Sequence, residues 1–206
     1  METSPYLVAI GASADGLGAI STVLRGLPRA FPAPVLVVLH RRGSGPLATI
    51  LARKTGLPVT EPSAVEVIQP GHVYVAPSDV HLVVNDGHVE LRRSEKVAFS
   101  RPSVDVLFES VAQVYGPRAI GVLLSGGGRD GAKGLQAIRA SGGLTVVQDP
   151  GDARIPYMPK AAIEADGIDW TLRLDQIGPA LGEIVLSRPA AAAPIPVDRE
   201  DAAGSS

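Results

Sequence analysis

Four short, largely apolar segments constrain the fold of this chain more than any other feature of its sequence. Strands that are covered on both faces have this pattern, because helices pack on each side of a parallel sheet. We therefore expect four buried strands in one parallel sheet. They lie at residues 6–10, 35–39, 119–124 and 144–148.

Between these segments, apolar side chains recur at helical spacing. Ser103 is a suitable N-cap for one helix, and Asp105 lies in its first turn, where the helix dipole favours an acidic side chain. Another helix should end at Gly142-Gly143. Strands that alternate with helices predict right-handed βαβ units, and therefore an α/β fold with a doubly wound, mostly parallel sheet and helices on both faces. The helical patterns cover residues 17–27, 47–51, 104–111 and 131–141.

One stretch of the chain departs from this alternation. Segments at residues 72–76, 81–84 and 88–91 have strand character, and Asn85-Asp86-Gly87 separates the last two. Asp-Gly between alternating strands is a strong hairpin signal. We therefore expect an antiparallel hairpin at the edge of the sheet.

The length of the chain indicates one folded domain. A chain of 206 residues can bury a substantial core, and we expect the domain to span residues 1–186. Residues 187–206 are rich in alanine and proline and then charged, so we expect a disordered tail there.

Composition excludes several classes of protein. The absence of cysteine excludes disulfides, thiolate zinc sites and cysteine nucleophiles. Aromatic residues make up 4% of the chain and the net charge is -2, so we expect no nucleic-acid binding. No segment has the ~20 apolar residues that a membrane span needs, and the N-terminus lacks the basic region of a signal peptide. We therefore expect a cytoplasmic protein that is not embedded in a membrane.

Chemically useful side chains follow three of the predicted strands. Ser13 follows the first strand in a G-x-S-x-x-G pattern, His40 follows the second, and Asp130 lies in a glycine-rich segment after the third. Ligands of open α/β sheets bind at the carboxyl ends of the strands, so these three side chains should converge. They would supply a nucleophile, a base and a carboxylate that orients the base. Asp149 and Asp152 follow another strand and are alternative acids.

The glycines at residues 126–128 suggest a second role for this edge of the sheet. Backbone N–H groups can turn inward there without a Cβ in the way. Gly127 and Gly128, together with Ala14 at the start of the first helix, could therefore stabilise an oxyanion. A phosphate-binding loop or a plain flexible turn is the more frequent explanation of such glycines alone.

Other polar residues have structural explanations. Asp15 is expected to cap the helix that begins near Gly16. His72 and His88 are expected on the solvent side of their strands, whereas His81 could either face the site or end a loop.

Several ordered motifs carry a family resemblance. The most specific is Arg-Pro-Ser-Val-Asp-Val-Leu-Phe at residues 101–108, which is followed by residues 119–126 and by Asp130-Gly131-Ala132. Further matches lie at residues 70–77, 148–149 and 158–163. In these motifs the chain resembles the catalytic domain of the chemotaxis protein-glutamate methylesterases, the CheB family, from about residue 6 to about residue 185.

The resemblance implies an activity and a set of roles. Ser13, His40 and Asp130 match the nucleophile, base and carboxylate of the family. The family hydrolyses γ-glutamyl methyl esters on cytoplasmic helices of chemoreceptors and releases methanol, and some members also deamidate receptor glutamines. The resemblance implies the same acyl-transfer reaction here, with a methylated receptor or receptor-like partner and without a metal or organic cofactor.

The resemblance also bears on regulation. Family members usually carry an N-terminal receiver domain that is phosphorylated. This chain begins at the first predicted strand, so we expect no receiver domain in it. The protein is then either a stand-alone enzyme or a subunit that works with a separate methyltransferase or receiver-domain protein.

Departures from the family pattern keep two other functions open. Family members usually have threonine and then glycine after the nucleophile, where Ala14 and Asp15 stand here, and methionine is common at the position of Gly127. The alternative to an active enzyme is therefore a catalytically weakened regulatory or binding module of the same fold. A third possibility is a phosphate- or nucleotide-binding protein that uses residues 126–131.

Overall fold

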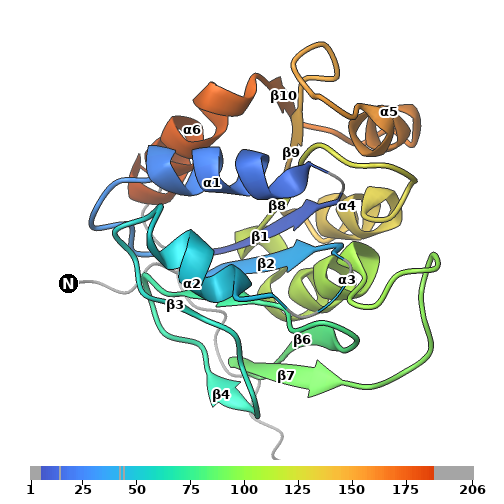
Figure 1. Ribbon diagram of the computed structural model, residues 1–206. Coiled ribbons are helices and arrows are strands. Elements are labelled where there is room, and N and C mark those ends of the chain that lie inside the picture. Colours follow the sequence, from blue (N-terminus) through green and yellow to red (C-terminus); the bar gives the residue numbers. More distant parts are fainter. Residues whose placement is uncertain (1–5, 14, 42, 44, 188–206) are drawn as a thin grey trace, which may run out of the picture.

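Seven parallel strands form the central sheet of the computed structural model, which describes residues 6–13, 15–41, 43 and 45–187 (Figure 1). The strand order is β10-β9-β8-β1-β2-β5-β3. All four predicted strands are confirmed, and they are the neighbours β9, β8, β1 and β2 near the middle of the sheet. The strands are β1 (Leu7–Ala12), β2 (Val35–Leu39), β3 (Val59–Thr60), β5 (Val73–Val75), β8 (Ala119–Leu123), β9 (Leu144–Gln148) and β10 (Trp170–Leu172).

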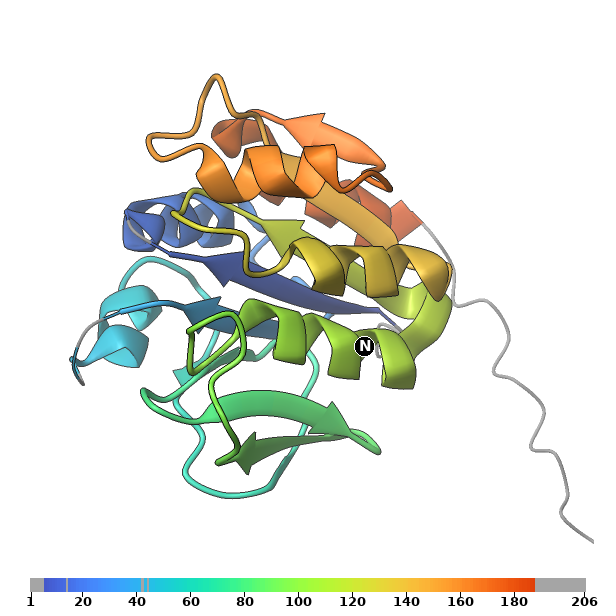
Figure 2. The same cartoon turned by 90° about the vertical axis from the view of Figure 1, so that its right-hand side faces the viewer.

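Helices cover both faces of this sheet, as predicted (Figures 1 and 2). Side chains alternate along each strand, so Val8 and Ile10 join one apolar core while Leu7 and Ala9 join the other. One face carries α1 (Gly16–Gly26), α2 (Leu47–Ala52) and α6 (Leu174–Ser187), and the other carries α3 (Val104–Tyr115), α4 (Ala132–Ala140) and α5 (Tyr157–Glu164).

The predicted hairpin is confirmed, but it lies in a second sheet rather than at the edge of the first. It consists of β6 (His81–Asn85) and β7 (His88–Arg92), and β7 also pairs with β4 (Glu66–Val67). The apolar face of β6 packs on α3, and this contact places the small sheet beyond that helix (Figure 2). Residues 73–75, which the sequence grouped with the hairpin, instead form the parallel strand β5.

The order of the strands places a topological switch point beside β1. After β1 the chain builds β2, β3 and β5 on one side, and it later builds β8, β9 and β10 on the other. Ligands of doubly wound sheets bind at the carboxyl ends of the strands near such a point. This edge of the sheet is therefore the place to look for a functional site.

Two further findings concern membrane spans and the predicted tail. None of the helices in the described part is long and apolar enough to cross a membrane. The predicted tail, apart from Ser187 at the end of α6, lies outside the described residues, so the proposed domain boundary stays a prediction.

Candidate active site

Ser13 and His40 leave the sheet side by side. Their predecessors Ala12 and Leu39 are paired in register at the ends of β1 and β2. The backbone N–H of His40 donates to the carbonyl oxygen of Ala12 at 3.0 Å, and the N–H of Ser13 donates to the carbonyl oxygen of Ser125, just after β8, at 3.1 Å. Three strand ends thus fix the backbone around Ser13.

The His40 ring is joined to the carboxylate of Asp130. Nε2 of His40 lies 2.8 Å from Oδ2 of Asp130, and the two side chains are 17% and 4% exposed. An ionised carboxylate only accepts hydrogen bonds, so Nε2 carries the proton and Nδ1 of the neutral ring keeps a free lone pair. Nδ1 is therefore the ring atom that can act as a base.

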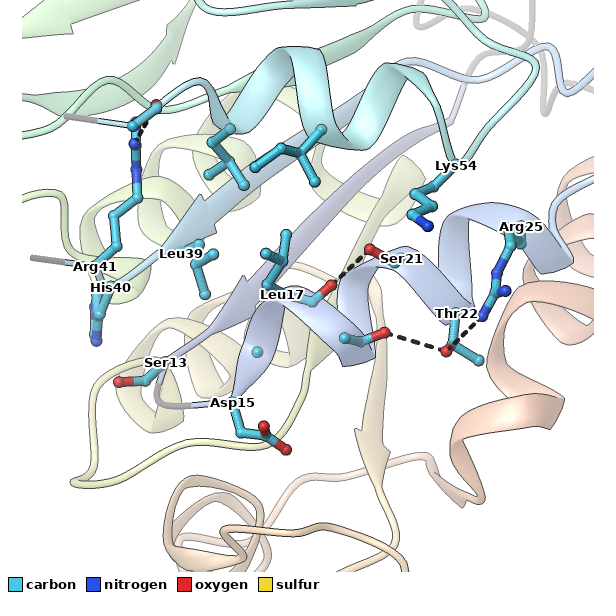
Figure 3. A pocket seen from close by; sticks show the side chains of 15 residues that line it. Ser13, Asp15, Leu17, Ser21, Thr22, Arg25, Leu39, His40, Arg41 and Lys54 are labelled. Carbon is cyan, nitrogen blue, oxygen red and sulfur yellow. Dashed lines mark hydrogen bonds between the residues drawn. The ribbon is translucent and has the colours of Figure 1, made fainter. Parts of the chain in front are cut away.

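The Ser13 side chain lies beside the His40 ring at the mouth of a cleft that both residues line (Figure 3). No hydrogen bond joins their side chains in the described part of the chain. Such bonds are often long without substrate and shorten in the reacting complex. The sequence prediction that Ser13, His40 and Asp130 converge therefore agrees with the geometry.

The carboxylate of Asp130 is held at the N-terminus of α3. Oδ1 accepts hydrogen bonds from the Ser103 hydroxyl and the Asp105 N–H, both at 2.9 Å, and Oδ2 accepts one from the Val104 N–H at 2.8 Å. Free N–H groups and the helix dipole favour an anion at this position. Burial acts to raise the pKa of Asp130, but the hydrogen bond from His40 and the backbone N–H groups outweigh it, so the pKa lies below its ordinary value.

A second buried carboxylate makes the reciprocal contact. Oδ1 of Asp105, in the first turn of α3, accepts hydrogen bonds from the N–H groups of Gly131 and Gly134 at the start of α4, both at 2.8 Å. Burial raises the pKa of Asp105 to about 6, and the nearby charge of Asp130 adds to this effect. The N-terminus of α3 thus binds the carboxylate of Asp130, which lies just before α4, and the N-terminus of α4 binds the carboxylate of Asp105 in α3.

His81 binds the backbone of Ser103, the residue whose hydroxyl donates to Asp130. Its side chain is fully buried at the start of β6. Nδ1 accepts a hydrogen bond from the Ser103 N–H at 3.2 Å, and Nε2 donates to the carbonyl oxygen of Glu95 at 3.0 Å. The sequence left open whether His81 faces the site or ends a loop, and it does neither, because it anchors the residue that donates to Asp130.

The glycine-rich segment after β8 closes the site on one side. A Cβ at position 126 would lie 2.7 Å from the Ser13 Cβ and 2.2 Å from the Met158 sulfur, so only glycine fits there. The N–H of Gly126 donates to the carbonyl oxygen of Ile155 and is not available to an oxyanion. Gly127 and Gly128 are exposed, and within the described residues no protein acceptor binds their N–H groups.

Gly127 and Gly128 therefore stay candidate oxyanion donors. Ala14, the third predicted donor, lies outside the described residues.

The cleft extends from Ser13 and His40 between α1 and α2 and has a volume of about 800 Å³. Apolar side chains, among them Leu17 and Leu39, line its middle, while Arg25 and Lys54 lie at the end away from Ser13 (Figure 3). Ser13 and His40 therefore lie at one end of a cleft that has an apolar middle and two cations at its other end.

The prediction that Asp15 caps α1 is wrong. Asp15 occupies the N-cap position, but its φ is 66° and its side chain makes no capping hydrogen bond. A capping side chain needs an extended backbone, which turns its oxygen toward the N–H groups of the first turn. In the left-handed conformation the carboxylate points away, and it accepts a hydrogen bond from Arg154 at 3.2 Å instead.

The alternative acids are engaged elsewhere. Asp149 accepts from the Gly151 N–H in its own turn, at 2.8 Å. Asp152 accepts from the Leu174 N–H at 2.8 Å and forms an ion pair with Arg173. Both carboxylates stabilise loops, and Asp130 alone of the three contacts His40.

His72 and His88 were both expected on the solvent side of their strands, and His72 departs from this expectation. His72 is half-buried, stacks on Tyr74 and forms a hydrogen bond with the Thr60 hydroxyl at 3.0 Å, so it is not a solvent-side residue. His88 is half-buried as the first residue of β7, where its Nδ1 lies 2.8 Å from the carbonyl oxygen of Asp86.

Comparison with known proteins agrees with the fold. The family model of the CheB methylesterases matches residues 8–181. A putative protein-glutamate methylesterase/protein-glutamine glutaminase of Leptospira interrogans is 43% identical over 173 residues, which cover 82% of this chain and 90% of that protein. The protein-glutamate methylesterase FrzG of Myxococcus xanthus is also 43% identical, over 86% of this chain, and the match spans 54% of that longer protein.

A solved structure extends the comparison to three dimensions. The crystal structure of the Thermotoga maritima CheB methylesterase catalytic domain matches with a TM-score of 0.83 and 34% identity, covering 90% of this chain and all of that one. Residues 8–181, which the family model matches, contain the central sheet apart from Leu7 at the start of β1, and they contain each residue of the candidate site from Ser13 to Asp130. The chain belongs to the CheB methylesterase family.

Proposed function

We propose that this protein hydrolyses glutamyl methyl esters on methylated chemoreceptor-type proteins, with Ser13 as nucleophile, His40 as base and Asp130 as the carboxylate that orients His40. The observation that carries the proposal is the His40–Asp130 hydrogen bond of 2.8 Å beside Ser13, at the carboxyl ends of the central strands. The names of the relatives, protein-glutamate methylesterases, supply the class of substrate.

In the first half of the reaction, Oγ of Ser13 attacks the ester carbonyl while Nδ1 of His40 takes the hydroxyl proton. Asp130 stabilises the resulting imidazolium through Nε2. The tetrahedral intermediate then expels the methoxy group, which receives the proton from Nδ1 and leaves as methanol. The N–H groups of Gly127 and Gly128 are the proposed donors to the intermediate oxyanion.

In the second half, water attacks the glutamyl-serine ester and gives its proton to Nδ1 of His40. Collapse of this intermediate returns the proton to Ser13 and releases the free glutamate side chain. The same steps would convert a glutamine to glutamate with ammonia as the leaving group. The glutaminase part of several relatives' names supports this second activity.

The test is a methanol-release assay on methylated receptor membranes. Ser13→Ala should abolish release, by a factor of about 10³ or more, while its thermal unfolding matches that of the wild type. Ser63→Ala is the matched control, because Ser63 is exposed in the loop between β3 and β4 and should release methanol at the wild-type rate. Equal release by the Ser13 and Ser63 variants would rule out the nucleophile.

The weakened-module alternative rests on Ala14, Asp15 and Gly127, and of these the carboxylate of Asp15 lies two residues from the nucleophile. Its ion pair with Arg154 offsets that charge, which favours the active enzyme. Receptor binding without turnover would support the alternative.

The phosphate-binding alternative is not favoured by the geometry. The N–H groups of Gly131 and Gly134 at the start of α4 already bind the Asp105 carboxylate, and Asp130 adds a further negative charge. A phosphate would have to displace one buried anion and approach another. Nucleotides should therefore leave the thermal unfolding of the protein unchanged.

The predicted cytoplasmic location, the absence of a cofactor and the separate methyltransferase or receiver-domain partner stay predictions. The chain spans about half the length of relatives such as FrzG, so regulation of the longer proteins does not transfer directly.

A further inference from the structure

A tight turn at residues 97–100 lies in the segment that joins β7 to α3. The N–H of Val97 donates to the carbonyl oxygen of Ser100 at 3.1 Å, and the N–H of Ser100 donates to the carbonyl oxygen of Val97 at 2.8 Å. The two residues between them, Ala98 and Phe99, have φ values of 49° and 65°. Two-residue turns with positive φ at both central positions favour Asn-Gly or Asp-Gly.

Phenylalanine is an unfavourable residue for the backbone conformation of this turn. The left-handed region is unfavourable for a bulky side chain with a Cβ. The phenyl ring is also 98% exposed, so it gains no burial in return. A residue that is unfavourable both for its backbone and for its solvation points to a function that requires it.

The turn lies next to the reacting residues. Phe99 and His40 line the same hollow, of about 830 Å³, which shares His40 and Arg41 with the cleft between α1 and α2. In Figure 1 the segment between β7 and α3 projects at the side of the molecule toward which β1 and β2 point. A protein bound across Ser13 and His40 would therefore be within reach of Phe99.

The charge around Phe99 indicates the chemistry of that protein. The hollow is lined by the cations Arg41, Lys96 and Arg101 and by the carboxylate of Asp79. Asp79 is paired with Arg101, and Arg41 is paired with Glu61. The cleft between α1 and α2 adds the cations Arg25 and Lys54 and the carboxylate of Asp15, which is paired with Arg154. Cationic side chains thus outnumber carboxylates on the surface around His40, although the whole chain carries a net charge of -2.

We propose that Phe99 is a docking residue for the protein substrate, where it contacts an apolar side chain on an acidic segment that carries the glutamyl ester. The proposal rests on the proposed function, and it adds that recognition extends beyond the ester group. Aromatic side chains are frequent anchors of protein interfaces, and complementary charges around them favour the correct partner. A small ester that fills only the space near Ser13 and His40 would not reach Phe99.

The test compares two substrates in one assay of methanol release. One is the methylated receptor in membranes, and the other is the γ-methyl ester of N-acetylglutamate amide. Phe99→Ala should lower kcat/KM for the receptor about tenfold more than kcat/KM for the small ester, mainly through KM. Leu186→Ala is the matched control, because Leu186 is a 60% exposed apolar residue at the end of α6, and it should leave the ratio unchanged.

A second variant separates docking from folding. Phe99→Gly suits the positive φ, so its melting temperature should equal or exceed that of the wild type while the ratio falls as for Phe99→Ala. Phe99→Tyr, which keeps the ring, should restore the ratio.

Each outcome decides the proposal. If Phe99→Gly and Phe99→Ala change both substrates equally, or neither, Phe99 is not a docking residue, and the proposed function stands. If the wild type hydrolyses neither ester, the proposed function fails and the docking role falls with it.

Discussion

The two halves of the candidate site are built in different ways. On the acid side, Asp130 accepts four hydrogen bonds, from Ser103, Val104, Asp105 and His40, and its side chain is only 4% exposed. On the nucleophile side, Ser13 is partly exposed, and within the described residues no partner binds its hydroxyl. Folding alone completes the hydrogen bonds of Asp130, whereas in the proposed reaction the substrate supplies the partner of Ser13.

The difference has a physical cause. A carboxylate can be buried only if hydrogen bonds replace its hydration, and the N-terminus of α3 and the ring of His40 supply them. A nucleophile has to meet a substrate carbonyl, so its hydroxyl cannot be occupied in the same way. We expect substitutions on the acid side to change both stability and activity, and substitutions beside Ser13 to change mainly activity.

The largest effect is expected for Asp130→Asn. An amide can no longer stabilise the His40 imidazolium, and we expect kcat for the ester to fall by about 10³ to 10⁴. The free energy of unfolding should also fall by about 1–3 kcal/mol. The reason is that the NH₂ group of the asparagine is a donor and would face the hydrogen-bond donors that the carboxylate of Asp130 now binds. Methanol release and urea unfolding measure the two effects.

Asp149→Asn is the control for this prediction, since its carboxylate accepts only within its own exposed turn. A folded Asp130→Asn variant that keeps near-normal release would show that the acid side serves the fold alone.

A smaller effect is expected at His81, and two substitutions separate its bonds. Asn at position 81 can still accept from the Ser103 N–H but cannot donate to the Glu95 carbonyl, whereas Gln can reach Glu95 but not Ser103. Each loses one buried hydrogen bond, so both should lose about 1–3 kcal/mol of stability. If His81 positions Ser103 and Asp130, the Gln variant should be about tenfold slower than the Asn variant.

The two His81 variants serve as controls for each other. Equal rates at equal stability would mean that His81 only stabilises the protein, and that positioning stops at Ser103.

The third prediction concerns the pH dependence of stability. The pKa of Asp105 is raised from 3.8 to about 6 in the folded protein, so its contribution to stability is fully present below about pH 4 and is lost as pH rises through 6. Asp105→Asn keeps the acceptor for Gly131 and Gly134 and removes the buried charge. The variant should therefore gain about 1–3 kcal/mol over the wild type at pH 8 and much less at pH 4.

Urea unfolding at both pH values measures this difference. A variant that is less stable than the wild type at pH 8 would contradict the prediction, and would show that α4 requires an anion at its N-terminus.

The sequence allowed the open half of the site to be predicted better than its buried half. Ser13 and His40 follow apolar strands that the sequence reveals, and adjacent parallel strands bring their ends together. Asp130 was predicted from the same argument. The roles of Ser103 and Asp105 were recognised only within their own helix, as a cap and as a favourable charge in the first turn.

The bonds from Ser103 to Asp130 and from Asp105 to Gly131 join segments 26 or 27 residues apart. They depend on how closely α3 and α4 pack, which no local pattern encodes. His81 was equally hidden, because its partners Glu95 and Ser103 belong to a loop and a helix end that meet only in the folded protein. Asp15 was misjudged because its left-handed backbone conformation is not visible in the sequence.

The smallest effects are expected beside Ser13, at Asp15 and Arg154. Asp15→Gly removes an exposed negative charge near the developing oxyanion and suits the φ of 66°. We expect kcat to rise about threefold, which corresponds to an interaction of less than about 1 kcal/mol in water, and stability to rise by about 0.5 kcal/mol. Arg154→Ala leaves the Asp15 carboxylate unpaired, so it should lower kcat by a similar factor.

The opposite signs of these two substitutions are the decisive feature. An electrostatic influence on Ser13 requires that removing the anion and removing its cation move kcat in opposite directions, and 0.5 M salt should reduce both changes. If both substitutions lower kcat, Asp15 acts by holding the loop through Arg154 rather than through its charge. The nucleophile side would then depend on fixed geometry as much as the acid side does, and the contrast between the two halves would be one of burial alone.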